Sequence, residues 1–281
     1  MTYAKHVIQH TKFSCTLEKI RNTYKTWSKS FDLPKNGPLA CMDVGCGSGR
    51  VLIESVEPLL PENYSELVGI DIDHSMIEYC KSLKVDSRIS FEQMDIGTDK
   101  LPEKFNKRFN LLFSFFCLMY VRDFRQALRN SSEMLKPNGE LLYMFMFKKN
   151  LVWECYKDLS RKKIWKPYTQ EFADFLPLYA GEDRDLELKD DFSQAKLEVV
   201  NHEFQSNYSI RTSRSAIIDL LQSMNTIYYS VPGDKKEEFR KDFAVSMSNI
   251  IGCDFMDEGK LDEEYEVACP TVVIHARKKF E

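Results

Sequence analysis

The sequence lacks the features that define several large classes of protein. Although it contains 8 cysteines, it has no C-x-x-C pair and no Cys/His cluster with zinc spacing. A formal net charge of −4 gives no basic field for nucleic acid. No apolar run approaches the ~18 residues of a membrane span, and residues 1–20 contain no signal-peptide core. These absences, together with cysteines expected to be reduced and mostly buried, favour a metal-free cytoplasmic protein with no membrane span and no nucleic-acid partner.

Glycine is scarce, but three of the 11 glycines lie within five residues. An apolar run, Leu39–Val44, carries the acid Asp43 and leads into Gly45, Gly47 and Gly49. A helical pattern follows at once, so the segment is typical of a strand, a glycine turn and a helix N-terminus. Glycine has no Cβ and tolerates positive φ, so a ligand can lie against the backbone there. Because the helix start offers unpaired N–H groups to a negative group, we expect a nucleotide-like cofactor.

Strand and helix patterns alternate along most of the chain. They predict an α/β fold with a doubly wound, mostly parallel, seven-stranded Rossmann-like sheet in one domain, residues 1–281. Strands are expected at Leu39–Val44, Glu66–Ile72, Ile89–Met94, Phe109–Phe116, Glu140–Phe147, once within Leu197–Ile210, and at Tyr265–Ala276. Helices are expected at Gly49–Glu57, His74–Leu83 (capped by Asp73), Asp123–Leu135, 213–225 and 234–250. An amphipathic helical segment is expected over residues 1–36, and an aromatic-rich helical cap is expected as an insertion over about residues 148–192.

The spacing of the glycines distinguishes between cofactors. A dinucleotide fingerprint, G-x-G-x-x-G, would require a third glycine at position 50, where the chain has Arg50. The observed Asp-x-Gly-x-Gly-x-Gly pattern instead resembles the first motif of class I S-adenosylmethionine (SAM) methyltransferases. The turn Lys136–Gly139 also resembles the one before the fifth strand of many of these enzymes. The resemblance implies SAM as the cofactor and S-adenosylhomocysteine as its product.

Ligands of doubly wound sheets bind at the carboxyl ends of the strands. Asp71 follows the second strand, where a carboxylate can accept hydrogen bonds from both ribose hydroxyls. Asp95 follows the third and can accept from the adenine amino group, while Ile96 packs on the ring. Asp43 would fix the turn or receive the ammonium group through its neighbours, and the backbone at Ser114 would line the methionine part. The expected cofactor-binding residues are Asp43, Gly45, Cys46, Gly47, Gly49, Asp71, Ile72, Asp95, Ile96 and Ser114.

More specific pieces of the sequence resemble juvenile hormone acid methyltransferase and its arthropod relatives. These pieces are Leu67–Asp71, Phe113–Leu118, Val121–Asp123, Tyr156–Ser160 and Trp165–Tyr168. The family transfers the methyl group of SAM to the carboxylate of a sesquiterpenoid acid such as farnesoic acid. The resemblance implies a carboxyl O-methyltransferase of juvenile hormone biosynthesis that acts on a lipophilic acid.

The resemblance also implies catalytic and substrate-binding residues. In the family the N-terminal segment begins with a tyrosine and carries a glutamine that reaches the active site, and Tyr3 and Gln9 resemble this pair at a spacing one residue shorter. After the fourth strand the family usually has His-Trp, where this chain has Met119 and Tyr120. We expect Gln9 to donate a hydrogen bond to the substrate carboxylate and Tyr120 to be a second donor or an aromatic wall. Candidates for an apolar pocket around the acyl chain are Phe115, Phe116, Met119, Trp153, Tyr156, Trp165 and Tyr168.

Several alternatives stay open on the sequence. The acceptor could be another lipophilic acid, an amine or a phenol, and His6 or His10 could be its polar partner. The chain could also be a non-catalytic relative that carries a terpenoid or senses SAM. A nucleophilic role for Cys46 would need a base, and no His is near it in the sequence. The oligomeric state, monomer or homodimer, is not determined.

Overall fold

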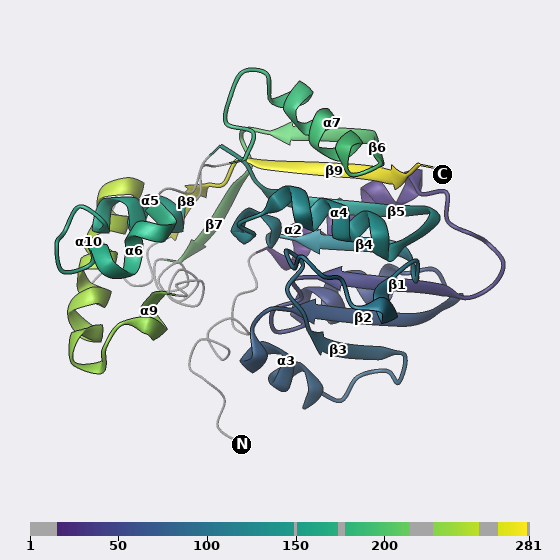
Figure 1. The fold of residues 1–281 in the computed structure, drawn as a ribbon, viewed down its shortest axis with the longest axis horizontal. Helices are drawn as coiled ribbons and strands as arrows, with labels where there is room; N and C mark the ends of the chain where they lie inside the picture. Colours follow the sequence, from purple (N-terminus) through teal and green to yellow (C-terminus); the bar gives the residue numbers. More distant parts are fainter. Residues whose placement is uncertain (1–15, 149–150, 174–177, 214–226, 253–263, 280–281) are drawn as a thin grey trace.

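The computed structural model describes residues 16–148, 151–173, 178–213, 227–252 and 264–279. Seven strands form one sheet in the order β3-β2-β1-β4-β5-β9-β6, which Figure 1 shows as the central layer. The neighbours from β3 to β5 are parallel, and β9 runs antiparallel to β5 and to β6. The strands are β1 (Leu39–Val44), β2 (Tyr64–Asp71), β3 (Ile89–Gln93), β4 (Phe109–Phe115), β5 (Leu135–Met146), β6 (Leu197–Gln205) and β9 (Thr271–Lys278). The predicted seven-stranded, mostly parallel sheet is confirmed.

Two predicted strands near the C-terminus are wrong in their extent, and β5 also begins earlier than expected, at Leu135 instead of Glu140. The segment expected to hold one strand before Ile210 forms β6 and then β7 (Ser209–Ser213), and the last predicted strand divides into β8 (Glu264–Ala268) and β9. Strands β7 and β8 pair antiparallel in a separate two-stranded sheet. Pro270 lies at the division between β8 and β9. Proline has no N–H and a fixed φ, so a strand pairing cannot continue unchanged through it.

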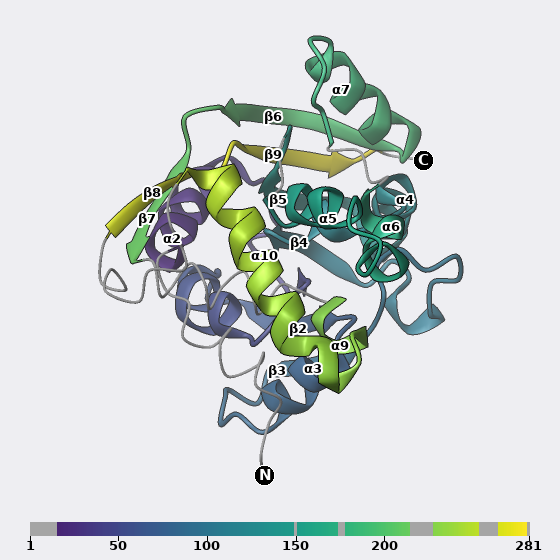
Figure 2. The same cartoon turned by 90° about the vertical axis from the view of Figure 1, so that its left-hand side faces the viewer.

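Helical elements cover both faces of the sheet, as Figures 1 and 2 show. One face carries α4 and α7, whereas α2, η2 and α3 lie on the other. The α-helices are α2 (Leu17–Trp27), α3 (His74–Lys81), α4 (Phe124–Met134), α5 (Leu151–Leu159), α6 (Lys166–Ala173), α7 (Arg184–Gln194), α9 (Ile227–Ser230) and α10 (Lys236–Ile251). The other helical turns are η1 (Ser28–Ser30), η2 (Val51–Val56), η3 (Glu57–Leu59), η4 (Glu103–Phe105), η5 (Leu118–Tyr120) and η6 (Gly233–Lys235).

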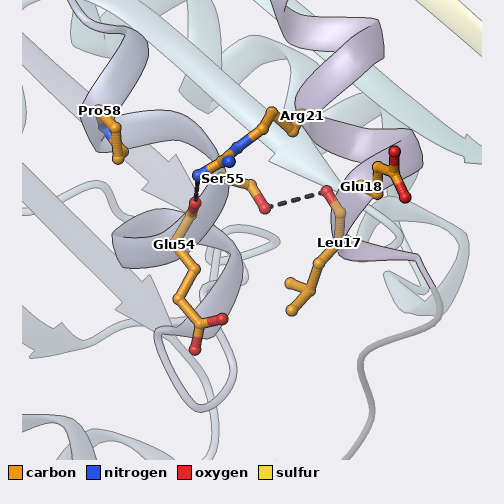
Figure 3. A pocket seen from close by; sticks show the side chains of 6 residues that line it. All are labelled: Leu17, Glu18, Arg21, Glu54, Ser55 and Pro58. Atoms are coloured by element: carbon orange, nitrogen blue, oxygen red, sulfur yellow. Dashed lines mark hydrogen bonds between the residues drawn. The ribbon is translucent and has the colours of Figure 1, made fainter.

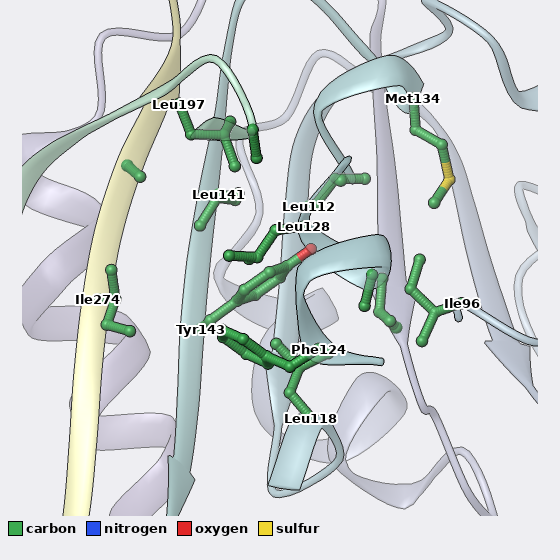
Figure 4. Close-up of a cluster of buried hydrophobic side chains, with 14 of the residues drawn as sticks. Ile96, Leu112, Leu118, Phe124, Leu128, Met134, Leu141, Tyr143, Leu197 and Ile274 are labelled. Carbon is green, nitrogen blue, oxygen red and sulfur yellow. The ribbon is translucent and has the colours of Figure 1, made fainter. Parts of the chain in front are cut away.

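The core under α4 is the larger of the two that sandwich the sheet. Asp123 caps α4 by accepting a hydrogen bond from the Gln126 N–H at 2.8 Å. Buried Phe124 and Leu128 lie four residues apart and so face the sheet together. Figure 4 shows them against β4 and β5 in a cluster with Tyr143, whose hydroxyl donates to Ser131. Burial of each large apolar side chain contributes about 1.5–3 kcal/mol, so this layer fixes the sheet on which the strand ends are aligned.

A buried ion cluster attaches the segment after α2 to the sheet. Glu140 in β5 is fully buried and accepts hydrogen bonds from the Arg277 guanidinium, at 2.6 and 2.9 Å, and from the Asp32 N–H, at 3.2 Å. The His275 ring lies 3.3 Å from Glu140 and 3.1 Å from the Ser30 hydroxyl. Burial by itself would raise the pKa of Glu140, but these bonds outweigh it and hold the pKa below its ordinary value. The chain between α2 and β1 is therefore held against the middle of β5.

A cap of helices lies beyond the carboxyl ends of the parallel strands (Figure 1). Its core is formed by α5, α9 and α10 together with β7 and β8, and α6 packs on α5. The structure thus draws this layer from a wider part of the chain than the expected 148–192. It also separates α7 from the cap, because Leu188 and Phe192 pack into the core under α4. The helix expected at 213–225 lies almost wholly outside the described residues.

Candidate active site

The turn after β1 has the backbone that its glycines predict. Gly45, Gly47 and Gly49 have φ of 78°, 52° and 76°, all in the left-handed region. The N–H groups of Gly45 and Cys46 both donate to the carbonyl of Ile70, at 2.8 and 2.9 Å. A Cβ on Gly45 would lie only 2.2 Å from the Cys117 sulfur. The turn is therefore folded tightly against the ends of two neighbouring strands, and only glycine fits there.

The helix after the turn differs from the prediction of an α-helix over Gly49–Glu57. The structure has a π-helical turn, η2, that begins at Val51 and ends at Val56. Its wider hydrogen bonding is shown by the Glu57 N–H, which bonds to the carbonyl of Leu52. Such turns are frequent at functional sites because they alter the direction of the backbone N–H groups.

Asp71 ends β2 beside the glycine turn. Its Oδ2 accepts from the Gly47 N–H at 2.8 Å, and its Oδ1 accepts from the Asp73 N–H at 2.9 Å. Each carboxylate oxygen retains a lone pair for a ligand hydroxyl. Asp73 instead caps α3, as predicted, by accepting from the N–H groups of Ser75 and Met76. Ile72 is 65% exposed between these two acids and offers an uncovered apolar surface to a flat ligand ring.

Asp43 is a buried acid whose carboxyl group is not fully hydrogen-bonded by the described residues. It is 2% exposed, and its Oδ2 has no hydrogen-bond partner among the described residues. Burial, and then the charge of Asp71, raise the pKa of Asp43 well above its ordinary value. Burial also raises the pKa of Asp71 against the effect of its backbone hydrogen bonds. Because an orphaned buried oxygen is costly, the pair fits a ligand that brings donors or positive charge, as SAM does.

The remaining predicted cofactor residues differ in their placement. Asp95 is exposed and accepts from the Gly97 N–H at 2.8 Å. Ile96 is buried in the core under α4, where Figure 4 shows it, so its contact with an adenine ring stays a prediction. Ser114 is buried and donates from its hydroxyl to the carbonyl of Val44 at 2.7 Å, which ties the end of β4 to that of β1.

Cys46 lies inside the turn but is not activated as a nucleophile. A hydrogen bond with Cys80, burial and the nearby acids raise the pKa of Cys46 well above its ordinary value. The sulfur of Cys80 also lies 3.3 Å from the carbonyl oxygen of Gly47. The Cys46 thiol is therefore a protonated packing group beneath the turn.

The end of β4 meets the cap through aromatic rings. Tyr120, in η5, has its ring centroid 5.8 Å from that of Trp153 in α5. The Trp153 indole donates to the carbonyl of Met119 at 3.2 Å, and Trp153 lies 5.7 Å from Tyr156. Tyr120 packs against both the sheet core and the cap core, so it lies at the seam between them. We call the contact of Met119, Tyr120, Trp153 and Tyr156 the aromatic seam.

The other predicted pocket residues lie in or against the hydrophobic cores of the sheet and the cap. Phe115 is buried in the core on the α2 face, whereas Phe116 has φ of 58° and contacts both sheet cores. Trp165 is completely buried in the cap, where its ring packs on Phe239 at 5.1 Å and its indole donates to Asp242 at 2.5 Å. Tyr168 is partly buried beside the same cap core. Gln9 and Tyr3 lie outside the described residues.

Tyr208 is a residue of this region that the sequence analysis did not single out as part of the site. Its ring lies 6.3 Å from that of Phe116, and the Lys19 ammonium lies 4.7 Å from its centroid. Tyr208 packs against the core on the α2 face and the cap core. No local signal marks it, because Lys19, Phe116 and Tyr208 are far apart in the sequence and meet only in the folded protein.

A separate surface cavity of 540 Å³ lies between α2 and η2. Figure 3 shows that its lining side chains belong to α2 and to the segment from η2 into η3, with the Ser55 hydroxyl donating to the carbonyl of Leu17 at 3.0 Å. None of the predicted site residues lines it. The chemistry of the strand ends therefore defines the candidate site, and this cavity does not.

A sheet with this strand order, a left-handed glycine turn after β1 and an acid at the end of β2 defines a class I SAM-dependent methyltransferase. Residues 36–175 match the family described as "Methyltransferase domain". The juvenile hormone acid O-methyltransferase of Drosophila melanogaster is 33% identical over 254 residues, covering 86% of this chain and 82% of that protein. The chain therefore belongs to the juvenile hormone acid O-methyltransferase family.

Two further comparisons agree with this placement. The Bombyx mori protein of the same description is 25% identical over 240 residues, which cover 79% of this chain and 84% of the relative. A Bacillus halodurans C-125 structure, described as that of a candidate methyltransferase, has a TM-score of 0.56 at 14% identity, covering 95% of this chain and all of that chain. This last likeness shows the fold alone.

Two observations on metal binding and membrane spans apply to the described residues. They contain no group of three or more His, Cys, Asp or Glu side chains arranged to hold a metal ion. None of the helices in the described ranges has both the length and the apolar composition needed to cross a bilayer.

Proposed function

We propose that this methyltransferase transfers the SAM methyl group to the carboxylate of a lipophilic acid, a sesquiterpenoid such as farnesoic acid or juvenile hormone acid. The aromatic seam carries the proposal. It joins the end of β4, next to the cofactor turn, to the cap, and it supplies apolar ring surface together with the Tyr120 hydroxyl. The named activity of the Drosophila and Bombyx relatives supports the same class of acceptor.

The chemistry of a carboxylate acceptor fits the groups present. SAM, when bound, supplies an electrophilic methyl group on a sulfonium. A carboxylic acid is already ionised at neutral pH, since its ordinary pKa is about 4, so no general base is needed. The three described histidines all bond elsewhere: His74 contacts Gln93, His202 contacts Asp185 and His275 contacts Glu140. A phenol, with an ordinary pKa of about 10, would need a base to become a nucleophile.

In this proposal the protein contributes positioning and exclusion of water. Asp71 and the glycine turn hold the cofactor, Gln9 donates to one oxygen of the substrate carboxylate, and Tyr120 is the second donor or wall. Alignment of two bound reactants can account for ~7–11 kcal/mol of barrier reduction in favourable cases. Unchanged turnover in both Gln9→Ala and Tyr120→Phe would remove these two assignments.

The first experiment is an incubation with SAM and farnesoic acid, followed by mass spectrometry for methyl farnesoate and S-adenosylhomocysteine together. Farnesol is the matched control, because it has the same chain without the carboxylate. Formation of both products from the acid and of neither from farnesol supports the proposal. No turnover by a folded protein that binds SAM in calorimetry would redirect the search to amine or phenol acceptors. Absence of SAM binding would favour the non-catalytic carrier.

A further inference from the structure

A dense group of cations covers the turn between α5 and α6. Five basic side chains, those of Lys157, Arg161, Lys162, Lys163 and Lys166, fall within ten residues and are all exposed. Asp158 is the one acid in this stretch. The chain as a whole carries a formal net charge of −4. The basic turn is therefore a local reversal of the protein's overall charge.

Contacts with Asp242 in α10 hold this turn in one conformation. Trp165 is completely buried, and its indole donates to Oδ2 of Asp242 in α10, at 2.5 Å. The other oxygen of Asp242 pairs with Lys162 at 2.8 Å. Backbone bonds from the N–H groups of Lys162 and Trp165 to the carbonyls of Leu159 and Lys162, both 2.9 Å, close the turn. The exposed cations of the turn therefore lie on a structured part of the protein surface.

Within the described ranges, acids pair with only part of the charge in the turn. Lys163 and Lys166 form no ion pair within the described part of the chain, and Arg161 approaches Asp158 only at 3.4 Å while 74% exposed. Between these cations Ile164 is an exposed apolar side chain, the neighbour of the buried Trp165. Exposed cations around an exposed isoleucine match an anionic surface with an apolar layer beneath it. Purely ionic recognition of an acidic protein would not use the isoleucine.

We propose that the α5–α6 turn docks the cap onto an anionic lipid surface. The basic side chains contact the headgroup phosphates and carboxylates, and Ile164 enters the boundary with the acyl chains. Helix α5 then connects this surface to the aromatic seam: from Trp153 to the end of the helix at Leu159 is about 9 Å, at 1.5 Å per residue. Docking would bring the seam near the phase in which a lipophilic molecule dissolves. The surface itself does not depend on the identity of the acceptor.

The test is co-sedimentation of the full chain with vesicles of phosphatidylcholine alone or mixed with phosphatidylserine, at low and at physiological ionic strength. We expect binding to the anionic vesicles that weakens with salt. Each basic residue near such a surface contributes about fivefold in partitioning, so Lys163→Gln with Lys166→Gln should weaken binding about 25-fold. The matched control is Lys29→Gln with Lys35→Gln, which removes the same charge from exposed positions between α2 and β1 and should bind as the wild type. Thermal unfolding checks that both pairs fold.

Two outcomes overturn the proposal. The first is no preference of the wild type for the anionic vesicles, or an equal loss in both double variants. The second is that the protein binds soluble polyglutamate as tightly as it binds the vesicles, and that Ile164→Ser changes neither affinity. This result would assign the turn to an acidic protein partner. A fall in vesicle binding on Ile164→Ser, with the salt dependence retained, supports contact with lipid. Because the vesicles contain no substrate, these results stand apart from the assay with farnesoic acid.

Discussion

The buried carboxyl group of Asp43 lies next to that of Asp71, at the ends of neighbouring strands, and the charge of Asp71 helps to raise the pKa of Asp43. Asp71 accepts a hydrogen bond from the glycine turn, and Oδ2 of Asp43 lacks a partner among the described residues. Two acids close together in a buried position oppose each other in the free protein. Such opposition is expected where a bound ligand supplies the compensation.

Asp43→Asn is expected to stabilise the free protein while weakening SAM binding. An acid whose folded pKa is raised loses stability as the pH increases from about 4, its unfolded value, towards that folded pKa. The asparagine removes this loss and should raise the unfolding free energy at pH 7 by about 2 kcal/mol. Urea unfolding between pH 4 and 7 and calorimetry with SAM are the measurements. Asp99→Asn, at an exposed position outside the predicted cofactor site, is the control and should leave both stability and SAM binding unchanged. A destabilised Asp43→Asn protein would contradict the prediction.

Gly45→Ala is expected to destabilise the protein by more than the strain of a positive φ would by itself. The new Cβ would meet Cys117 at 2.2 Å, and φ is already 78°. Gly252 provides a matched control, since its φ is 80° and no atom lies within 4 Å of its added Cβ. Strain alone should cost about 1 kcal/mol in Gly252→Ala, whereas the clash should bring the loss in Gly45→Ala to about 2–4 kcal/mol. Equal losses measured by denaturant unfolding would show that the turn can move away from β4.

Glu140→Gln is expected to have a pH-dependent effect. The pKa of Glu140 is lowered in the folded protein, so its contribution to stability is complete above the unfolded value of about 4.3 and is lost as the pH falls through the folded pKa. The variant should be about 2 kcal/mol less stable at pH 7, and the difference from the wild type should shrink below about pH 4. Glu78→Gln, exposed on α3, is the control. A constant difference down to pH 3, by urea unfolding, would exclude an ionised Glu140 as the cause.

Trp165→Phe is expected to affect stability and not catalysis. The substitution removes the bond to Asp242 and part of the cap core, and should cost about 2 kcal/mol. On the proposed function, KM for farnesoic acid should stay the same, because the indole is enclosed by the cap. Trp153→Phe is the comparison: it lies at the aromatic seam and should raise KM several-fold. An increase in KM with unchanged unfolding free energy in Trp165→Phe would return this residue to the pocket wall.

The features of the fold that depend on residues close together in the sequence could be predicted from it. The five parallel strands, the capping role of Asp73 and the left-handed glycines follow from patterns of a few residues each. The two errors in strand extent near the C-terminus have a common cause. An apolar, β-branched pattern predicts a strand but does not say which sheet it joins, and only the pairing of β7 with β8 separates these strands from the main sheet.

The candidate site likewise has features that the sequence predicts and features that it does not. The class of cofactor could be predicted from the sequence, because the spacing of Asp43 and the glycines resembles the first motif of class I SAM methyltransferases. The packing of the folded chain was needed to show that Oδ2 of Asp43 has no partner among the described residues, that Tyr208 joins the site region, and that Trp165 is enclosed in the cap. The physical reason is that burial and unsatisfied hydrogen bonding depend on what packs around a side chain. That packing comes from residues distant in the sequence, which local patterns do not encode.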